Sequence, residues 1–406
     1  MKKQALIILK VQLRKVKLSE HKFIVAGAGF SGAVITERIA NELNEKVLIY
    51  EKRDHLGGNA YDFVNKNGII IHKYGPHIFH TFSKKVWNYI SRFTEWFEYK
   101  HRVLAKVDDK LIPLPFDFKS LEILLTDKSA KIKETLLKTY GENKKTPVYE
   151  LLNSNKKILK EFGEFVFEKI FFNYSKKQWG VNPLSLSKEV LKRVPVFIGY
   201  TNSYFDDPYY GIPKDGFTRI FNKMLDNKNI KILLKKDFKE DFRIKDNRVF
   251  FKGKKFDGII IYTGEIDYLF DRKFGKLPYR SLKFEFEDCN LKEFQPVAVV
   301  NYPGKEKFTR ITEYKHFLNQ KVKKTTISKE YPGEYTPNKK NFNIPYYPIL
   351  SKENEELFEK YVKEAKEIKN IFLVGRLAEY RYYNMDNAIL RALETFEKIK
   401  SLWFYR

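Results

Sequence analysis

The chain has 406 residues, of which 43% are hydrophobic and 16% aromatic, so it is long enough for two or three packed units and too apolar for a disordered chain. Its net charge of +26 comes from lysines and arginines scattered among acidic residues, without zinc-finger spacing or a basic heptad helix, so we expect no nucleic-acid partner. The single cysteine, Cys289, excludes an internal disulfide and favours a reducing, cytoplasmic compartment. No apolar run approaches the roughly 18 residues of a membrane span, which predicts no membrane insertion.

Residues 1–21 form a basic lead-in whose only apolar run is interrupted by lysines and an arginine, unlike a signal peptide. The core pattern then begins with an apolar strand, a glycine turn, a helical segment, a second apolar strand and an acid: Lys22–Ala26, Gly27-Ala28-Gly29-Phe30-Ser31-Gly32, Ala33–Leu43, Lys46–Tyr50 and Glu51. This order predicts a dinucleotide site. The glycines let a pyrophosphate approach the backbone at a helix start, and Glu51 accepts hydrogen bonds from a ribose.

A second pair of glycines indicates which dinucleotide is bound. Gly57 and Gly58 follow six and seven residues after Glu51. This arrangement resembles the FAD signature of the flavoprotein group that includes the amine oxidases, and simple NAD enzymes lack it. We therefore expect FAD as the cofactor, with Lys52, Gly58 and Asn59 among the residues that bind it.

Three histidines stand in the next segment, His72-Lys-Tyr-Gly-Pro-His77-Ile78-Phe-His80-Thr81. Their spacings of five and three residues, with no cysteine nearby, do not build a metal site, so we expect no metal. The segment instead resembles the histidine loop of the UDP-galactopyranose mutase family, which lies against the isoalloxazine ring of the flavin. The resemblance implies that His77 and Ile78 contact the cofactor.

The resemblance to this family continues through nearly the whole chain after Lys22. The matching motifs, in order, are YSKKQWG at 174–180, LKRVP at 191–195, NSYF at 202–205, TRITE at 309–313, PYYPI at 345–349 and VGRLAEYRY at 374–382. It implies substrate-binding roles for Phe171, Tyr174, Trp179, Arg193, Tyr204, Arg310, Tyr347, Tyr382 and Asn384. It implies cofactor-binding roles for Gly27, Gly29, Phe30, Ser31, Gly32, Glu51, Lys52, Gly58, Asn59, His77, Ile78, Gly375, Arg376, Tyr382 and Met385.

Arginine and tyrosine suit the substrate that the family uses, a UDP-sugar. A guanidinium group binds phosphate oxygens bidentately, and a phenol adds a donor without adding charge. The resemblance implies that Arg193 and Arg310 hold the diphosphate, and we expect these two residues and His77 to be catalytic.

The reaction implied by the resemblance converts UDP-galactopyranose to UDP-galactofuranose, a precursor for polysaccharides such as capsule or lipopolysaccharide. N5 of reduced FAD acts as the nucleophile at the anomeric carbon, and the arginines stabilise the departing UDP. Three alternatives are open: a mutase of the same family acting on another nucleotide sugar such as UDP-arabinopyranose, an amine-oxidase-like FAD oxidoreductase, and a basic binding protein without a flavin. The oxidoreductase shares the glycine motifs but not KQWG, TRITE or PYYPI. A homodimer is compatible with every reading.

Two departures from the family pattern bear on the substrate. The family's YRYLDMD is YRYYNMD at 380–386, which places Tyr383 at a leucine and Asn384 at an aspartate. If Tyr383 faces the sugar it narrows the pocket, and we then expect a smaller sugar such as arabinopyranose to be accepted and an N-acetylated sugar to be a poor substrate. The family's paired phenylalanines fall on Ile170 and Phe171, so uridine packing is expected for Phe171.

The expected architecture is an α/β fold with a Rossmann-like FAD-binding domain, a helical domain and a mixed or antiparallel β-sheet domain. Apolar runs at 103–114, 281–286, 297–302 and 325–331 have strand character and fit an antiparallel sheet. The strand-like run 258–264 reads as part of the FAD-binding sheet, and the last helix is expected to begin near Asp386. We assign 22–81, 220–265 and 366–406 to the FAD-binding domain, 118–191 to the helical domain, and 82–117, 192–219 and 266–365 to the substrate domain.

Overall fold

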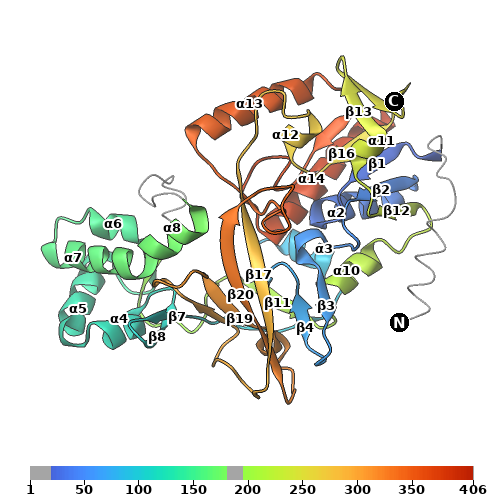
Figure 1. Cartoon of the computed structure of the whole chain (residues 1–406). Coiled ribbons are helices and arrows are strands. Elements are labelled where there is room, and N and C mark those ends of the chain that lie inside the picture. Colours follow the sequence, from blue (N-terminus) through green and yellow to red (C-terminus); the bar gives the residue numbers. More distant parts are fainter. Residues whose placement is uncertain (1–19, 181–194, 406) are drawn as a thin grey trace.

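The computed structural model describes residues 20–180 and 195–405. In Figure 1 a helical lobe lies on one side of a long central sheet, and an α/β lobe lies on the other. Blue and red segments lie together in the α/β lobe, so this lobe is assembled from both ends of the sequence.

A five-stranded parallel sheet forms the framework of the α/β lobe. Its strands, in spatial order, are β12 (Ile230–Leu234), β2 (Val47–Glu51), β1 (Phe23–Ala26), β16 (Ile259–Tyr262) and β22 (Ile371–Leu373). Each neighbouring pair runs parallel. Strands β1, β2 and β16 are buried along their whole length, which explains why their sequences are continuous apolar runs. The pairing of β16 with β1 confirms that 258–264 belongs to this sheet.

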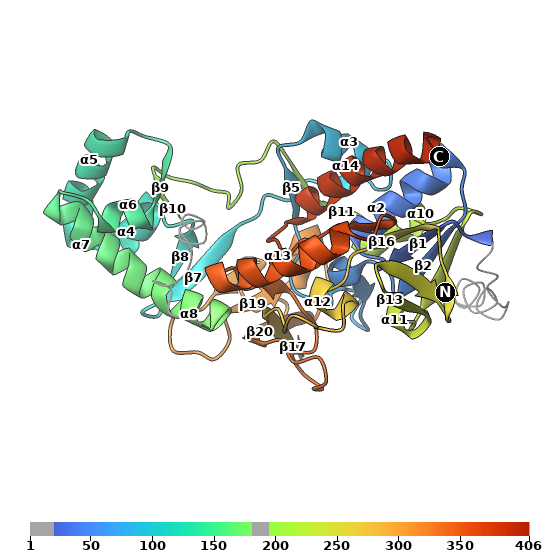
Figure 2. The same ribbon diagram turned by 90° about the horizontal axis from the view of Figure 1, so that it is seen from above.

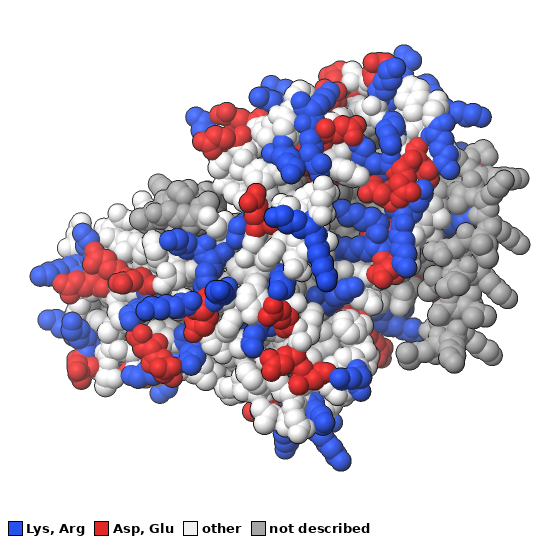
Figure 3. All heavy atoms as spheres, in the orientation of Figure 1, with Lys and Arg blue, Asp and Glu red and all other residues white. Residues whose placement is uncertain are grey.

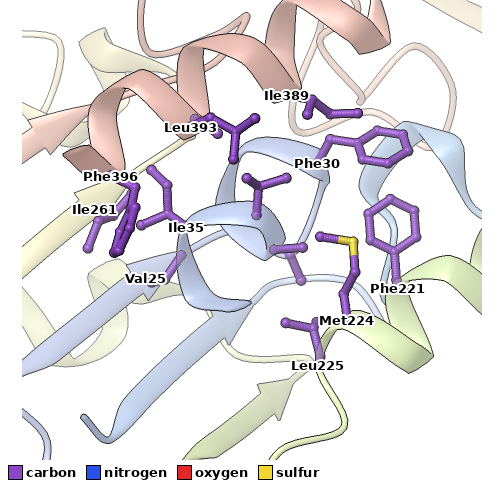
Figure 4. Close-up of a cluster of buried hydrophobic side chains, with 14 of the residues drawn as sticks. Val25, Phe30, Ile35, Phe221, Met224, Leu225, Ile261, Ile389, Leu393 and Phe396 are labelled. Atoms are coloured by element: carbon purple, nitrogen blue, oxygen red, sulfur yellow. The ribbon is translucent and has the colours of Figure 1, made fainter. Parts of the chain in front are cut away.

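Alternate residues of these strands enter two hydrophobic cores on opposite faces of the sheet. Phe23 and Val25 belong to the core shown in Figure 4, and Ile24 belongs to the other. The first core is covered by α2 (Phe30–Arg38), α10 (Phe217–Met224) and α14 (Met385–Phe404). The second is covered by α12 (Ile266–Leu269), α13 (Lys352–Lys366) and the meander of β13 (Phe242–Lys245), β14 (Arg248–Phe251) and β15 (Lys254–Lys255).

The helix after the glycine turn begins at Phe30, earlier than the predicted start at Ala33. Its last turn, Ile39–Leu43, widens into a π-helix and ends at Asn44, which has a left-handed backbone (φ 51). Helix α14 begins at Met385, one residue before the predicted Asp386. Both helices start beside the same edge of the parallel sheet, which brings two helix N-termini to one place.

The central sheet has seven strands. In spatial order they are β21 (Tyr347–Pro348), β17 (Tyr279–Cys289), β20 (Thr325–Glu334), β19 (Arg310–Glu313), β18 (Val299–Asn301), β7 (Val103–Val107) and β8 (Lys110–Leu114). A mixed or antiparallel sheet was predicted, and the neighbouring strands are antiparallel except for β18, which runs parallel to β7. The whole helical lobe separates these two strands in sequence, so no hairpin fixes their direction, and a strand's residue pattern does not reveal it. The sheet is mixed.

The helical lobe is formed by residues between β8 and β10. Its helices are α4 (Phe118–Leu124), α5 (Ser129–Tyr140), α6 (Val148–Leu152), α7 (Lys157–Val166) and α8 (Asn173–Trp179). A π-helical turn, Phe167–Phe172, joins α7 to α8, and strand β9 (Lys144–Pro147) pairs with β10 (Pro195–Ile198). In the view from above, α8 reaches the central sheet (Figure 2), where it contacts β20, while α4 contacts the edge strand β8.

Two helices pack differently from the sequence-based division into domains. Helix α3 (Lys84–Ile90) was assigned to the substrate domain, but Val86 and Ile90 are buried in the first core of the α/β lobe. Helix α13 was assigned likewise, but Tyr361 is buried in the second core. An amphipathic helix shows in its sequence that one face is buried, and it does not show which core receives that face.

Acidic and basic side chains alternate over the face of the molecule shown in Figure 3. The large net charge is therefore spread over this face and is not gathered into one stripe. Among the described residues, no helix is both long and apolar enough to cross a membrane.

Candidate functional site

A cavity of about 230 Å³ opens where β1 and β2 end and α2 begins. Its walls include most of the residues predicted to bind the cofactor: Gly27, Gly29, Phe30, Ser31, Glu51, Lys52, Gly58, Asn59, His77, Gly375, Arg376 and Met385. We call it the cofactor cavity. Residues far apart in the chain meet here because parallel strands place their carboxyl ends at one edge of a sheet.

The glycines of this cavity are required by close approaches of the backbone. Gly27 has φ +106, and a Cβ atom there would lie 2.1 Å from Oγ1 of Thr263. A Cβ atom on Gly58 would lie 3.0 Å from Cα of Gly29, so the two glycine turns touch each other. Gly32 does not line the cavity; a Cβ atom on it would lie 2.0 Å from the carbonyl oxygen of Gly27. Gly32 therefore supports the turn from behind.

The carboxylate of Glu51 is buried and held by two backbone donors. Oε2 accepts from the backbone N–H of Ala28 at 2.8 Å, and Oε1 accepts from that of Arg53 at 2.9 Å. These bonds fix the carboxylate at the end of β2 beside the glycine turn. Each oxygen keeps a further lone pair, so Glu51 can still accept a hydrogen bond from a ribose hydroxyl.

Two helix N-termini and one arginine supply hydrogen-bond donors to the cofactor cavity. The N-caps of α2 and α14, Gly29 and Asn384, make no side-chain cap hydrogen bond, and the first turn of α2 carries no acid. Nη1 of Arg53 is buried without a hydrogen-bond partner among the described residues, while Nη2 donates to Oδ1 of Asn59 at 2.8 Å. Free N–H groups, helix dipoles and a guanidinium with one unpartnered nitrogen fit the pyrophosphate of a dinucleotide. The sequence analysis did not assign a role to Arg53. Its position two residues after Glu51 could have indicated one.

A second cavity of about 210 Å³ adjoins the first. It contains many of the predicted substrate residues: Tyr174, Tyr204, Arg310, Tyr347, Tyr382 and Asn384. We call it the substrate cavity. Five residues line both cavities and form their shared wall: Asn59, His77, Arg376, Asn384 and Met385. Ile78 and Tyr382, which were predicted to bind the cofactor, line the substrate cavity.

Arg310 lies at the centre of a polar cluster in the substrate cavity. Its Nη2 donates to the hydroxyl of Tyr174 at 2.8 Å, and its Nε lies 3.1 Å from Oε1 of Glu330. Thr309 donates to the same Glu330 oxygen at 3.0 Å. Burial alone would lower the pKa of Arg310, but Glu330 and the neighbouring phenols raise it well above its ordinary value. Arg310 is thus a permanent cation. Sequence reasoning missed Glu330, because no motif pairs it with TRITE.

Aromatic rings and a guanidinium stack at the other end of the substrate cavity. The rings of Tyr347 and Tyr382 lie 5.1 Å apart and 15° from parallel. The guanidinium of Arg376 lies 5.2 Å from the first ring and 5.7 Å from the second. Trp179 packs at the edge of this pair, 6.1 Å from Tyr382. Arg376 also donates to the carbonyl oxygens of Tyr346 and Tyr383, which fixes it between the two cavities.

The phenols of the substrate cavity remain protonated at neutral pH. Burial raises the pKa of Tyr174, Tyr204 and Tyr347, and this effect outweighs the nearby Arg310, which lowers each of them. A neutral phenol donates one hydrogen bond and accepts others. These three hydroxyls and the Arg310 cation can therefore bind a diphosphate without a proton being exchanged.

Three histidines near the shared wall are held in the neutral form. Burial lowers the pKa of His77 to about 4 and that of His72 and His101 to about 3. Nδ1 of His72 accepts from the backbone N–H of His77 at 2.9 Å, and Nδ1 of His77 lies 2.7 Å from the carbonyl oxygen of Gly75. These contacts fix the loop that forms the wall. Within residues 20–180 and 195–405, no three acidic, cysteine or histidine side chains are grouped as metal ligands.

Two cations that face carbonyl oxygens fix α8, which carries Tyr174. Nζ of Lys177 donates to the carbonyl oxygens of Tyr302, Gly304, Glu306 and Phe308, all within 3.2 Å. Arg280 on β17 donates to the carbonyl oxygens of Gln178 and Lys177 at the C-terminus of the helix. The lysine of the KQWG motif thus ties the helical lobe to the turn between β18 and β19.

Some predicted residues lie elsewhere. Phe171 is 5% exposed and packs in the core of the helical lobe, so it lines neither cavity, and Trp179 stands beside the substrate cavity. Arg193 falls outside the described residues. Tyr383 lines the cofactor cavity and not the substrate cavity, so its ring does not narrow the space for a sugar.

Comparison with known proteins gives two family matches. The model described as UDP-galactopyranose mutase matches residues 169–382, and the one described as an NAD(P)-binding Rossmann-like domain matches residues 25–93. The chain is 38% identical to UDP-galactopyranose mutase of Mycoplasma genitalium, over 95% of this chain and 96% of that one. It is 34% identical to dTDP-fucopyranose mutase of Escherichia coli, over 92% and 97%.

Solved structures agree on the fold. A reduced UDP-galactopyranose mutase superposes with a TM-score of 0.71 at 16% identity, covering 94% of both chains. A redesigned putrescine oxidase superposes with a TM-score of 0.52 at 11% identity, covering 93% of this chain and 98% of that one. The fold is that of a UDP-galactopyranose mutase, and the two family matches together imply a flavin nucleotide as cofactor.

Proposed function

Because this chain belongs to the UDP-galactopyranose mutase family and is therefore an isomerase, we propose that it converts UDP-galactopyranose to UDP-galactofuranose with reduced FAD. The observation that carries this proposal is the wall shared by a dinucleotide-shaped cavity and a cavity rich in arginine and tyrosine. Such a wall lets the reactive edge of a cofactor face the sugar of a bound substrate.

The diphosphate would be held by charge and by neutral donors. Arg310 supplies the permanent cation, and Tyr174, Tyr204 and Tyr347 supply phenol hydroxyls in the same cavity. We propose that Arg193 adds a second guanidinium. Negative charge grows on the diphosphate as its bond to the sugar breaks, so these contacts strengthen in the transition state. Glu330 orients the guanidinium of Arg310, and its single negative charge does not cancel the positive charge of the whole site.

The residues of the shared wall would hold the sugar against the cofactor. A bound reduced flavin supplies a nucleophilic nitrogen, N5, for the anomeric carbon. His77 is neutral and is fixed by Gly75 and His72. It therefore adds a polar contact to the wall but no positive charge that would attract the diphosphate. The oxygen of Asn59 is occupied by Arg53, which leaves its NH₂ group as a donor to the cofactor or the sugar.

Turnover with a chemical reductant tests the proposal. The purified protein should contain FAD and form the furanose only after its flavin is reduced. The amount of reductant consumed should not increase with the amount of product. An amine-oxidase-like enzyme would instead have its flavin bleached by its own substrate, and a binding protein would carry no flavin. Full activity with oxidised flavin, or one equivalent of reductant lost per product, contradicts the isomerase.

A panel of nucleotide sugars decides the substrate. Tyr383 does not face the substrate cavity, which removes the reason to expect a smaller sugar, so we expect UDP-galactopyranose to give the highest kcat/KM. UDP-arabinopyranose and dTDP-fucopyranose are the informative competitors, since a relative of 34% identity carries the latter sugar in its name. UDP-N-acetylgalactosamine tests a bulkier sugar. If it gives the highest kcat/KM, the proposal that UDP-galactopyranose is the substrate is wrong.

A further inference from the structure

The hydroxyl group of Tyr346 is a buried polar group to which the proposed mechanism gives no role. Tyr346 comes directly before β21, is 2% exposed and lines the substrate cavity. Among the tyrosines that the structure describes, it is the one whose buried hydroxyl has no hydrogen-bond partner. Other buried phenols are paired: the hydroxyl of Tyr74 lies 2.6 Å from Nε2 of His55, and that of Tyr380 donates to two backbone carbonyl oxygens. An unpaired buried hydroxyl costs free energy, so a bound ligand is expected to supply its partner.

The backbone and the ring of Tyr346 are both held in place. Its backbone N–H donates to the carbonyl oxygen of Arg280 at 2.9 Å, and its own carbonyl oxygen accepts from Nη1 of Arg376 at 3.1 Å. The ring packs in a small hydrophobic cluster with Tyr74 and Leu282. The hydroxyl therefore has a fixed position in the wall of the substrate cavity.

A second buried donor without a partner lies beside this cluster. The guanidinium of Arg53 lies 4.6 Å from the centre of the Tyr74 ring, and its Nη1 has no hydrogen-bond partner among the described residues. Burial raises the pKa of Tyr346 well above its ordinary value, and Arg53 is the charge that opposes this rise most strongly. The phenol therefore keeps its proton, and Arg53 is close enough to influence it.

Asn59 connects this region to the wall shared by the two cavities. It lines both of them, and its Oδ1 accepts from Nη2 of Arg53. A guanidinium and an amide NH₂ group can only donate, and a phenol donates one hydrogen bond. The partner that Arg53, Asn59 and Tyr346 have in common is therefore an acceptor. A pyrophosphate at the start of α2 would lie in the cofactor cavity, which Tyr346 does not line.

We propose that the hydroxyl of Tyr346 donates to a carbonyl oxygen of the flavin ring, and that this hydrogen bond favours the reduced cofactor. The inference rests on the proposed function, because it requires a flavin ring at the shared wall. Reduction adds electrons to the ring, which makes its carbonyl oxygens stronger acceptors, and hydrogen bonds from the protein tune a cofactor in this way. Tyr346 thus helps to keep the cofactor in the form that the proposed reaction needs.

The reduction potential of the bound flavin tests this contact without any nucleotide sugar. It should be measured on FAD-loaded wild type, Tyr346→Phe and Tyr380→Phe by equilibration with a redox dye of known potential. Tyr346→Phe removes only the hydroxyl. We expect the preference for reduced over oxidised FAD to fall roughly 10-fold, which makes the potential about 30 mV more negative for a two-electron couple.

Tyr380→Phe is the matched control. It removes another buried phenol hydroxyl, from a residue that lines neither cavity, so the potential should stay at the wild-type value. Urea unfolding should show a lower midpoint for Tyr380→Phe, because its hydroxyl donates to carbonyl oxygens of the protein. FAD absorbance shows that each variant is loaded.

An unchanged potential in Tyr346→Phe would overturn the inference, and affinity measurements then identify the true partner of the hydroxyl. An equal loss of affinity for oxidised and reduced FAD would indicate the pyrophosphate, and weaker binding of UDP-galactopyranose would indicate the substrate. No loss of either affinity would indicate a buried water molecule. A shifted potential in a protein that isomerises no sugar leaves this contact standing and the proposed function wrong. Full isomerisation with an unchanged potential has the opposite meaning.

Discussion

The cofactor cavity and the substrate cavity share a wall, but they are built by different means. The cofactor cavity is bounded by glycines, backbone N–H groups and two helix N-termini, most of them from short continuous segments. The substrate cavity is bounded by side chains from the histidine loop, α8, β19, β20 and β21. One site recognises its ligand mainly through main chain, and the other does so through charged and aromatic side chains.

This difference explains how each cavity tolerates change. A main-chain site depends on the path of the backbone, so adding a single methyl group can destroy it. A side-chain site depends on individual groups and on the residues that orient them, so truncating those groups is what damages it. The following variants are arranged from the largest expected effect to the smallest.

Arg310→Ala should have the largest effect, and it should act only on the substrate side. Removing the guanidinium loses the phosphate contact and leaves Glu330 buried without its partner, which costs about 2–4 kcal/mol, or roughly 30- to 1000-fold in kcat/KM. Arg310→Lys should recover part of the loss, because it keeps the charge without the fork. Steady-state kinetics on FAD-loaded protein measure this, with the exposed Arg248→Ala as control. If the Arg310→Ala variant loses FAD, the two cavities do not act independently.

Gly32→Ala should damage the cofactor side alone. The new Cβ atom would lie 2.0 Å from the carbonyl oxygen of Gly27, so the glycine turn must shift, at a cost of up to about 3 kcal/mol, roughly 100-fold in FAD affinity. Titrating the apoprotein with FAD measures this. Gly253→Ala has a positive φ of +82 but open space around it, so it should cost only backbone strain of about 1 kcal/mol in stability. Equal FAD affinity in the two variants would contradict the packing argument.

Lys177→Met tests whether the substrate cavity depends on residues that orient its ligands. The three N–H donors of the lysine are shared among four carbonyl oxygens, and losing these contacts should loosen α8 and its Tyr174. We expect kcat/KM to fall roughly 10-fold, equivalent to about 1.4 kcal/mol, with FAD affinity unchanged. The adjacent, exposed Lys176→Met is the matched control. If both lysine variants behave as wild type, α8 is held by Arg280 and packing alone.

His101→Phe has the smallest expected effect near neutral pH, and its effect is on stability at acid pH. Burial, then Arg310 and His80, lowers the pKa of His101 in the folded protein to about 3 from its ordinary value of 6.5. Between pH 6.5 and about 4 the unfolded chain binds the proton and the folded protein does not, so stability falls as pH falls, by about 1.4 kcal/mol per pH unit at this site. The variant should lose this slope. Urea unfolding across this pH range measures it, and an unchanged slope would show that His101 titrates normally.

The sequence predicted the cofactor cavity better than the substrate cavity, and the reason is physical. A strand, a glycine turn and a helix start are neighbours in the chain. The spacing of Gly27, Gly29 and Glu51 therefore predicts how these residues are arranged in the fold. Arg310 and Glu330 lie on different strands, β19 and β20, and no local pattern pairs them. Phe171 is a different case. A family motif placed it at the substrate, and the fold buries it in the helical core.

The amino-acid sequence alone determined the elements whose signal is periodicity or backbone conformation: the buried strands 23–26, 47–51 and 259–262, the glycine turns, and the helix that follows the first of these turns. Only the tertiary structure decided the direction of β18 against β7, the core that receives α3 and α13, and the side of the wall on which Tyr383 lies. Periodicity and turn chemistry act between near neighbours in the chain. Strand direction, helix docking and side-chain contacts depend on free energies of burial summed over the whole fold, and distant segments contribute to them equally.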